Sequence, residues 1–133
     1  MVATVRALKM HGGLALNELG TEDLDALRRG VPNLLHHVRC IRDTFGLPCV
    51  VAINRFPTDT DREIALLTEL CGELGVNVVL STVWADGGRG GEALAREVVR
   101  LCETENRFRF AYELDAPVEE KITAVVRRVY GGA

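Results

Sequence analysis

Short apolar runs alternate with amphipathic stretches along this chain. Four of the runs are apolar enough for strands, and they lie near residues 2–7, 48–53, 76–81 and 108–112. Between and after these runs, apolar residues recur at the spacing of one helical face. Strands that alternate with helices predict a three-layer α/β/α fold with a mainly parallel sheet of about four strands.

Local residue patterns predict where the earlier helices begin and end. Thr21 fits the N-cap of a first helix. Gly30 and Pro32 then interrupt the pattern, and Pro32 suits the first turn of a second helix. Gly46 fits the end of that helix.

The later helices have clearer signals. Thr60 and Glu63 match a capping box, in which each side chain bonds the other residue's backbone amide, and Gly75 fits the end of the helix they open. Two more helices are predicted at Glu92–Cys102 and from about Pro117 to Tyr130.

Three loops rich in glycine or polar residues follow predicted strands. They span residues 9–13, 54–60 and 83–91. In parallel sheets, ligands gather at the carboxyl ends of the strands. We therefore expect the three loops to meet at one edge of the sheet.

Composition and charge exclude several classes of protein. The 133 residues suit one domain over residues 1–133, and 47% hydrophobic residues exclude a disordered chain. A net charge of -3 gives no reason to expect nucleic acid. No apolar run approaches the ~20 residues of a membrane span, and no basic leader opens the chain, so we expect a cytoplasmic protein without membrane contact.

The cysteines predict neither a metal site nor disulfides. They show no C-x-x-C pair and no metal-ligand spacing, which favours free thiols in a reducing compartment; they are Cys40, Cys49, Cys71 and Cys102.

Aromatic side chains at two strand exits are the first candidates for ligand contact. Phe56 and Pro57 directly follow the strand that ends at Ile53, and Trp84, the single tryptophan, lies in the loop after the next strand. Phe56 could simply cap the core, and a lone tryptophan is more often a core residue. As a pair on neighbouring strand exits, they could hold a planar heterocycle by stacking.

Polar or anion contacts have four candidates: Lys9, His11, Arg55 and Gly90. Gly90 belongs to the run GGRGG, which leads into a helix whose amides could attract an anion, although such loops often bind nothing. A Walker A loop needs Gly-Lys followed by Ser or Thr, and neither lysine of the chain fits this pattern.

Several long strings together resemble formate–tetrahydrofolate ligase, also called formyltetrahydrofolate synthetase. The similarity runs in order along the whole chain. It is carried by VATVRALKMHGG (2–13), NLLHHV (33–38), FGLPCVVAINRFPTDT (45–60), VWADGGRGG (83–91) and EKITAVVRRVYGGA (120–133).

The resemblance implies a function and a site. The family's enzymes join formate to tetrahydrofolate at the expense of ATP, giving 10-formyltetrahydrofolate. The residues matching Phe56, Pro57 and Trp84 form the pocket for the pterin ring of the folate substrate. ATP with Mg would be bound by an N-terminal P-loop region outside this chain, which we expect to be an interior piece of a homo-oligomeric ligase and inactive alone. The alternative is a non-catalytic folate-binding or assembly module.

Overall fold

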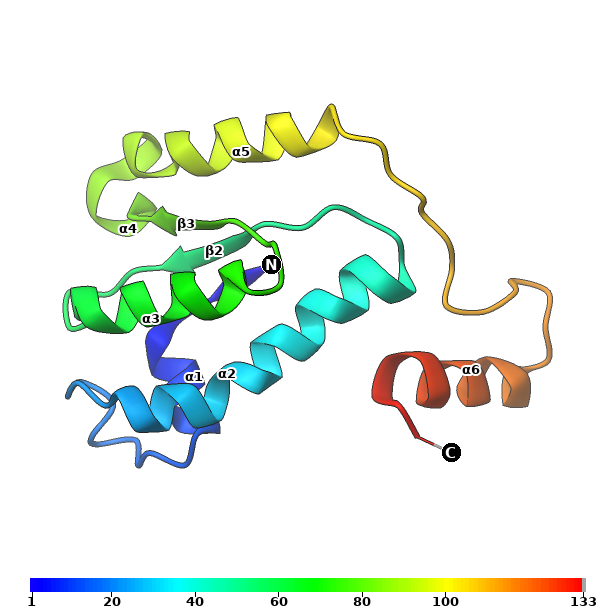
Figure 1. The fold of residues 1–133 in the computed structure, drawn as a ribbon, viewed down its shortest axis with the longest axis horizontal. Helices are drawn as coiled ribbons and strands as arrows, with labels where there is room; N and C mark the ends of the chain where they lie inside the picture. The colour runs from blue at the N-terminus through cyan, green and yellow to red at the C-terminus, as the bar shows by residue number, and fades with distance from the viewer. Residues whose placement is uncertain (133) are drawn as a thin grey trace.

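The computed structural model describes residues 1–132 and has an α/β fold with a parallel three-stranded sheet (Figure 1). The strands lie in the order β1 (Val2–Ala3), β2 (Val51–Asn54) and β3 (Val78–Ser81), and both neighbouring pairs are parallel. The predicted α/β class and the parallel pairing of the runs near 48–53 and 76–81 are confirmed. The sheet has three strands in place of the predicted four.

Helices lie on both sides of the strands in Figure 1. They are α1 (Val5–His11), α2 (Leu24–Arg39), α3 (Asp61–Gly72), α4 (Val83–Asp86), α5 (Glu92–Cys102) and α6 (Val118–Tyr130). A π-helical turn, η1 (Cys40–Thr44), extends α2, and a 3-10 turn, η2 (Gly87–Gly91), joins α4 to α5. Helix α5 packs along β3 on the side away from α2 and α3, while α6 follows an extended segment and contacts η1 at the end of α2.

The predicted strand over 2–7 is wrong beyond Ala3. The Thr4 hydroxyl accepts a hydrogen bond from the Ala7 amide at 3.1 Å, which is an N-cap, and α1 begins at Val5. A strand would place successive side chains on opposite faces, whereas Val5, Leu8 and Lys9 are all buried at helical spacing. Val2, Ala3 and Val5 favour a strand, but Thr4 interrupts the apolar run and is the cap that starts the helix.

The predicted break at Gly30 and Pro32 is also wrong. A single helix, α2, begins after Asp23, whose carboxylate accepts a hydrogen bond from the Ala26 amide at 2.7 Å, and it passes through Pro32. A proline inside a helix costs about 3 kcal/mol, and burial of a large aliphatic side chain gains about 1.5–3 kcal/mol. Four such side chains on one face span the proline, which explains why the helix continues: Leu27, Val31, Leu34 and Val38.

The fourth predicted strand, near 108–112, does not form. Residues 105–110 have no regular structure, and the amides of Arg107 and Arg109 donate to the carbonyls of Gly46 and Phe45. The segment therefore bonds to an irregular stretch of chain instead of a strand edge. Phe108 stays 50% exposed, so burial does not fix this segment in the sheet.

The other predicted helices are confirmed. Both hydrogen bonds of the Thr60–Glu63 capping box are present at the start of α3, and α5 and α6 form where predicted. Gly75, with φ of 66°, ends the turn after α3. These elements have local signals, which explains why the sequence predicts them well.

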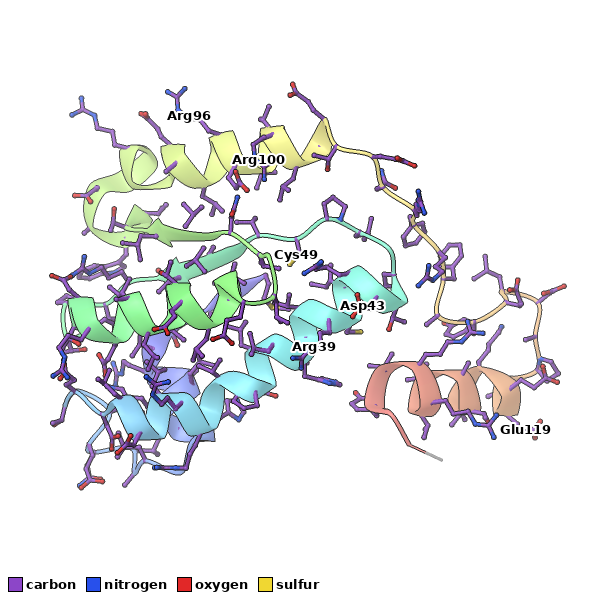
Figure 2. The ribbon with its side chains drawn as sticks, in the orientation of Figure 1. Arg39, Asp43, Cys49, Arg96, Arg100 and Glu119 are labelled. Carbon is purple, nitrogen blue, oxygen red and sulfur yellow. The ribbon has the colours of Figure 1, made fainter. Side chains whose placement is uncertain are left out.

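The core lies between the sheet and helices α1 to α3. Strand β2 is central, and its first three residues are buried. Cys49, just before β2, packs against this core (Figure 2). The apolar face of α6 stays exposed, including Val118 and Ile122, so a single domain over 1–133 stays a prediction.

Two glycines allow α1 and α2 to cross at close range. A Cβ on Gly30 would lie 1.8 Å from the Leu8 carbonyl oxygen, and a Cβ on Gly12 would lie 1.8 Å from the Ala26 carbonyl oxygen. The backbones therefore touch at positions where only glycine fits. The Arg29 side chain adds a 2.9 Å hydrogen bond to the Gly12 carbonyl.

Gly30→Ala is predicted to destabilise the fold severely, by about 3 kcal/mol or more, because the new methyl group forces the two helices apart. Gly72→Ala is the matched control, since a Cβ at Gly72 meets nothing within 4 Å. Alanine at this helical position should stabilise by up to about 1 kcal/mol. Urea denaturation of both variants measures the difference, and equal stabilities would contradict the close crossing.

Candidate functional site

Strands β2 and β3 end side by side, and this edge carries the candidate site. Asn54 lies opposite Ser81 at the last register position, and the Arg55 amide extends the ladder with a 3.1 Å bond to the Ser81 carbonyl. The loops 54–60 and 83–91 therefore leave the sheet as neighbours, as predicted. Loop 9–13 follows helix α1 instead of a strand, so its predicted origin is wrong.

The three aromatic-pocket candidates differ in exposure. Phe56 is half-buried and Pro57 is exposed in the turn after β2. Trp84, on α4, is 82% exposed. Each aromatic side chain thus has surface that an arriving planar ligand could cover, and neither belongs to the buried core.

Phe56 is held in place by Asp59. The Phe56 amide donates to one Asp59 carboxylate oxygen at 2.8 Å, and the Asp59 amide donates back to the Phe56 carbonyl at 3.0 Å. The other carboxylate oxygen is buried and has no partner among residues 1–132. Burial raises the pKa of Asp59 above its ordinary value, although the hydrogen bond from Phe56 opposes the shift. The turn that carries Phe56 is therefore closed by two reciprocal bonds.

A buried ion pair lies behind this turn. The Lys9 ammonium is 2.8 Å from a Glu63 carboxylate oxygen, and both side chains are almost completely inaccessible to solvent. Lys9 also donates to the Thr21 carbonyl at 2.7 Å, and Glu63 accepts from the amides of Asp23 and Thr60 at 3.2 and 3.0 Å. The pair thus joins α1, the segment before α2, and α3.

Glu63 stays ionised because its hydrogen bonds outweigh its burial. Burial alone would raise the pKa of Glu63, but the bond from Lys9 and the amides of Thr60 and Asp23 hold that pKa below its ordinary value. With its ammonium bonded in this way, Lys9 has a structural role in the described chain. Its contact with a ligand anion stays a prediction.

The other three polar candidates lie in different settings. His11 is exposed at the end of α1, and Arg55 pairs with Asp61 at 2.8 Å. Gly90 has a backbone role: its carbonyl accepts from the Thr82 amide at 3.1 Å, and a Cβ there would lie 2.5 Å from the Thr82 carbonyl carbon. This contact closes the loop that carries Trp84. Anion binding by these residues stays a prediction.

Sequence reasoning missed Arg6. Its guanidinium carbon lies 5.6 Å from the centroid of the Phe56 ring, within the range of a cation–π contact. The signal was present, because Arg6 lies three residues before Lys9 on the same helix. Reading residues 2–7 as a strand concealed this shared helix.

An apolar pocket of about 410 Å³ lies elsewhere, before β2 and beside α5. Its lining includes Leu47, Pro48, Val98 and Leu101. None of the predicted site residues lines it, so it is separate from the candidate site.

A comparison with known protein families identifies the family of this chain. The family model described as formate–tetrahydrofolate ligase matches residues 1–133, the whole chain. The chain belongs to the formate–tetrahydrofolate ligase family. This family carries out the ATP-dependent ligation of formate to tetrahydrofolate, so the function implied by the sequence resemblance is confirmed at the level of the family.

The described residues of this chain do not form a phosphate-binding loop for the family's nucleotide. The ammonium of Lys9 is bound to Glu63, and that of Lys121 donates to the Leu114 carbonyl at 2.7 Å. Neither lysine precedes a serine or threonine, as a phosphate-binding loop requires. We therefore derive no step through ATP from these residues.

The described residues contain neither a metal-binding cluster nor a helix that could span a membrane. Residues 1–132 hold no group of three or more histidine, cysteine, aspartate or glutamate side chains that could bind a metal ion. None of the described helices is both long and apolar enough to span a bilayer.

Glu63→Gln is predicted to cost about 3 kcal/mol at pH 7, because it leaves the Lys9 charge buried without its counter-charge. The lowered pKa of Glu63 means that its ionised form stabilises the fold above about pH 4.5, the ordinary value for a glutamate, and that this contribution is lost as pH falls through the folded pKa. The difference in unfolding free energy between wild type and variant should therefore shrink in acid.

Urea denaturation between pH 7 and pH 3 measures this difference. Glu105→Gln is the control, because Glu105 is 78% exposed and lies 3.5 Å from Arg107, a surface pair that contributes about 1 kcal/mol at most. A wild-type advantage over Glu63→Gln that stays constant with pH would contradict the role of the buried pair.

Proposed function

We propose that this chain supplies the pterin pocket of a formate–tetrahydrofolate ligase, with Phe56, Pro57 and Trp84 contacting the ring. The observation that carries the proposal is the placement of exposed aromatic surface on two neighbouring strand exits. Stacking of aromatic rings adds about 0.5–1.5 kcal/mol beyond the area that is buried.

The two aromatic residues would act differently on the ring. Phe56 is fixed by the reciprocal bonds to Asp59, so it offers a pre-ordered surface. Trp84 is presented on the short helix α4, within the loop closed by Thr82 and Gly90. Pro57 limits the backbone freedom of the turn that carries Phe56. Together they would hold the folate so that its amine faces the activated formyl group, and such positioning removes several kcal/mol from a reaction barrier.

Trp84→Ala in the ligase that carries this chain is predicted to raise the KM for tetrahydrofolate about 10- to 100-fold, with little change in the KM for ATP. Phe56→Ala should have a similar but smaller effect, because part of its ring is already covered. Phe108→Ala is the matched control, since Phe108 is 50% exposed and lies outside both loops. An unchanged KM for tetrahydrofolate in Trp84→Ala would contradict the pocket.

The chain alone is predicted to neither hydrolyse ATP nor form 10-formyltetrahydrofolate, because its described residues offer no triphosphate cradle. Trp84 is the single tryptophan, so its fluorescence should nevertheless report the addition of tetrahydrofolate to the isolated chain. Turnover of formate, ATP and tetrahydrofolate by the isolated chain would contradict the assignment of ATP binding to a region outside it. A fluorescence change in the chain, combined with inactivity of the longer polypeptide, would favour a non-catalytic folate-binding module.

Three finer expectations belong to the same proposal. Mg²⁺ would accompany ATP in a region outside this chain, the complete ligase would be a homo-oligomer, and the enzyme would work in the cytoplasm. They rest on the family membership of the chain.

A further inference from the structure

We propose that Arg6 is a substrate-binding residue of this pocket and that its guanidinium binds an anionic oxygen of a substrate. The inference rests on the proposed function. It adds a charge contact to a pocket so far described by aromatic residues alone.

The first argument is a comparison of neighbouring cations. Four cationic side chains lie on α1, on the turn after β2 and on the first turn of α3, and three have carboxylate partners: Lys9 with Glu63, Arg55 with Asp61, and Arg62 with Glu22. The fourth, Arg6, is exposed and forms no ion pair within residues 1–132. Among these four cations, the one without a counter-charge is therefore the one beside Phe56.

The second argument is the fixed position of Arg6. Helix α1 is anchored through Lys9 to Glu63 on α3, and it crosses α2 in backbone contact at Gly30. Phe56 is held by its turn with Asp59. The 5.6 Å approach of Arg6 to the Phe56 ring therefore connects two well-anchored parts of the fold.

The third argument is chemical. A guanidinium that contacts a ring keeps its N–H donors in its own plane, where they can bond a carboxylate or phosphate in a bidentate way. A ligand ring beside Phe56 lies next to these donors. Two substrate groups share the required chemistry: the glutamate carboxylates of tetrahydrofolate, and the phosphate that the ATP-dependent reaction transfers.

The test uses Arg6→Gln in the ligase that carries this chain, with equilibrium binding measured by calorimetry. Tetrahydrofolate is compared with tetrahydropteroate, which has the same rings without the glutamate, and inorganic phosphate is titrated separately. If glutamate is the ligand, tetrahydrofolate should bind about tenfold more weakly, equal to about 1.4 kcal/mol, and tetrahydropteroate should be unaffected. If phosphate is the ligand, only the affinity for phosphate should fall by that factor.

Two variants serve as controls. Arg6→Lys keeps the charge and should restore part of the lost affinity. Arg96→Gln removes an exposed arginine that projects from α5 on the far side of the strands (Figure 2) and should change nothing.

Unchanged affinity of Arg6→Gln for both the carboxylate and the phosphate ligands would overturn the inference. So would an equal loss for tetrahydrofolate and tetrahydropteroate, since that pattern reports only support of the Phe56 ring. Trp84→Ala separates this failure from that of the pocket: if it weakens folate binding while Arg6→Gln does not, only the inference about Arg6 falls.

Discussion

The buried pair of Lys9 and Glu63 is the interaction on which the arrangement of the site depends. Removing two charges from water is costly, and a buried pair is retained only where further hydrogen bonds complete it. Here the Thr21 carbonyl and the amides of Asp23 and Thr60 complete it. One cluster thereby connects α1, the approach to α2, and the start of α3.

The same cluster holds α1 close to the loop that leaves β2, although the two are far apart in the sequence. Glu63 is both the capping-box residue of α3 and the partner of Lys9, 54 positions earlier in the chain. Because Thr60 directly follows Asp59, the anchor also limits where the Phe56 turn can lie. Arg6 reaches the Phe56 ring from the other end of this connection. The Lys9–Glu63 pair therefore anchors both α1, which carries Arg6, and the turn that carries Phe56.

Local signals account for what could be predicted from the sequence. The capping box, α5 and the paired runs of β2 and β3 depend on neighbouring residues or on simple burial, and all of them form. The failures involve competition between signals. The Thr4 cap starts a helix where the apolar run predicts a strand. Burial of apolar side chains lets α2 continue through Pro32, where the proline predicts a break.

In the candidate site, too, some features follow from local sequence signals and others depend on the three-dimensional arrangement. Exposed aromatic residues at strand exits can be predicted from the order of the elements along the chain. The ion-pair partner of Lys9 could not be predicted from the sequence, because the pair forms only where α1 and α3 meet in three dimensions. Arg6 was missed for a related reason: its position beside Phe56 depends on α1 being a helix.

The double role of Glu63 has a consequence for motion at the start of α3. The first turn of a helix ordinarily frays, since its early amides have no partners within the helix. To open here, α3 would have to separate two buried charges as well as its capping bonds. Hydrogen exchange at the Thr60 and Glu63 amides should thus follow global unfolding, and the turn beside Phe56 should stay ordered with them.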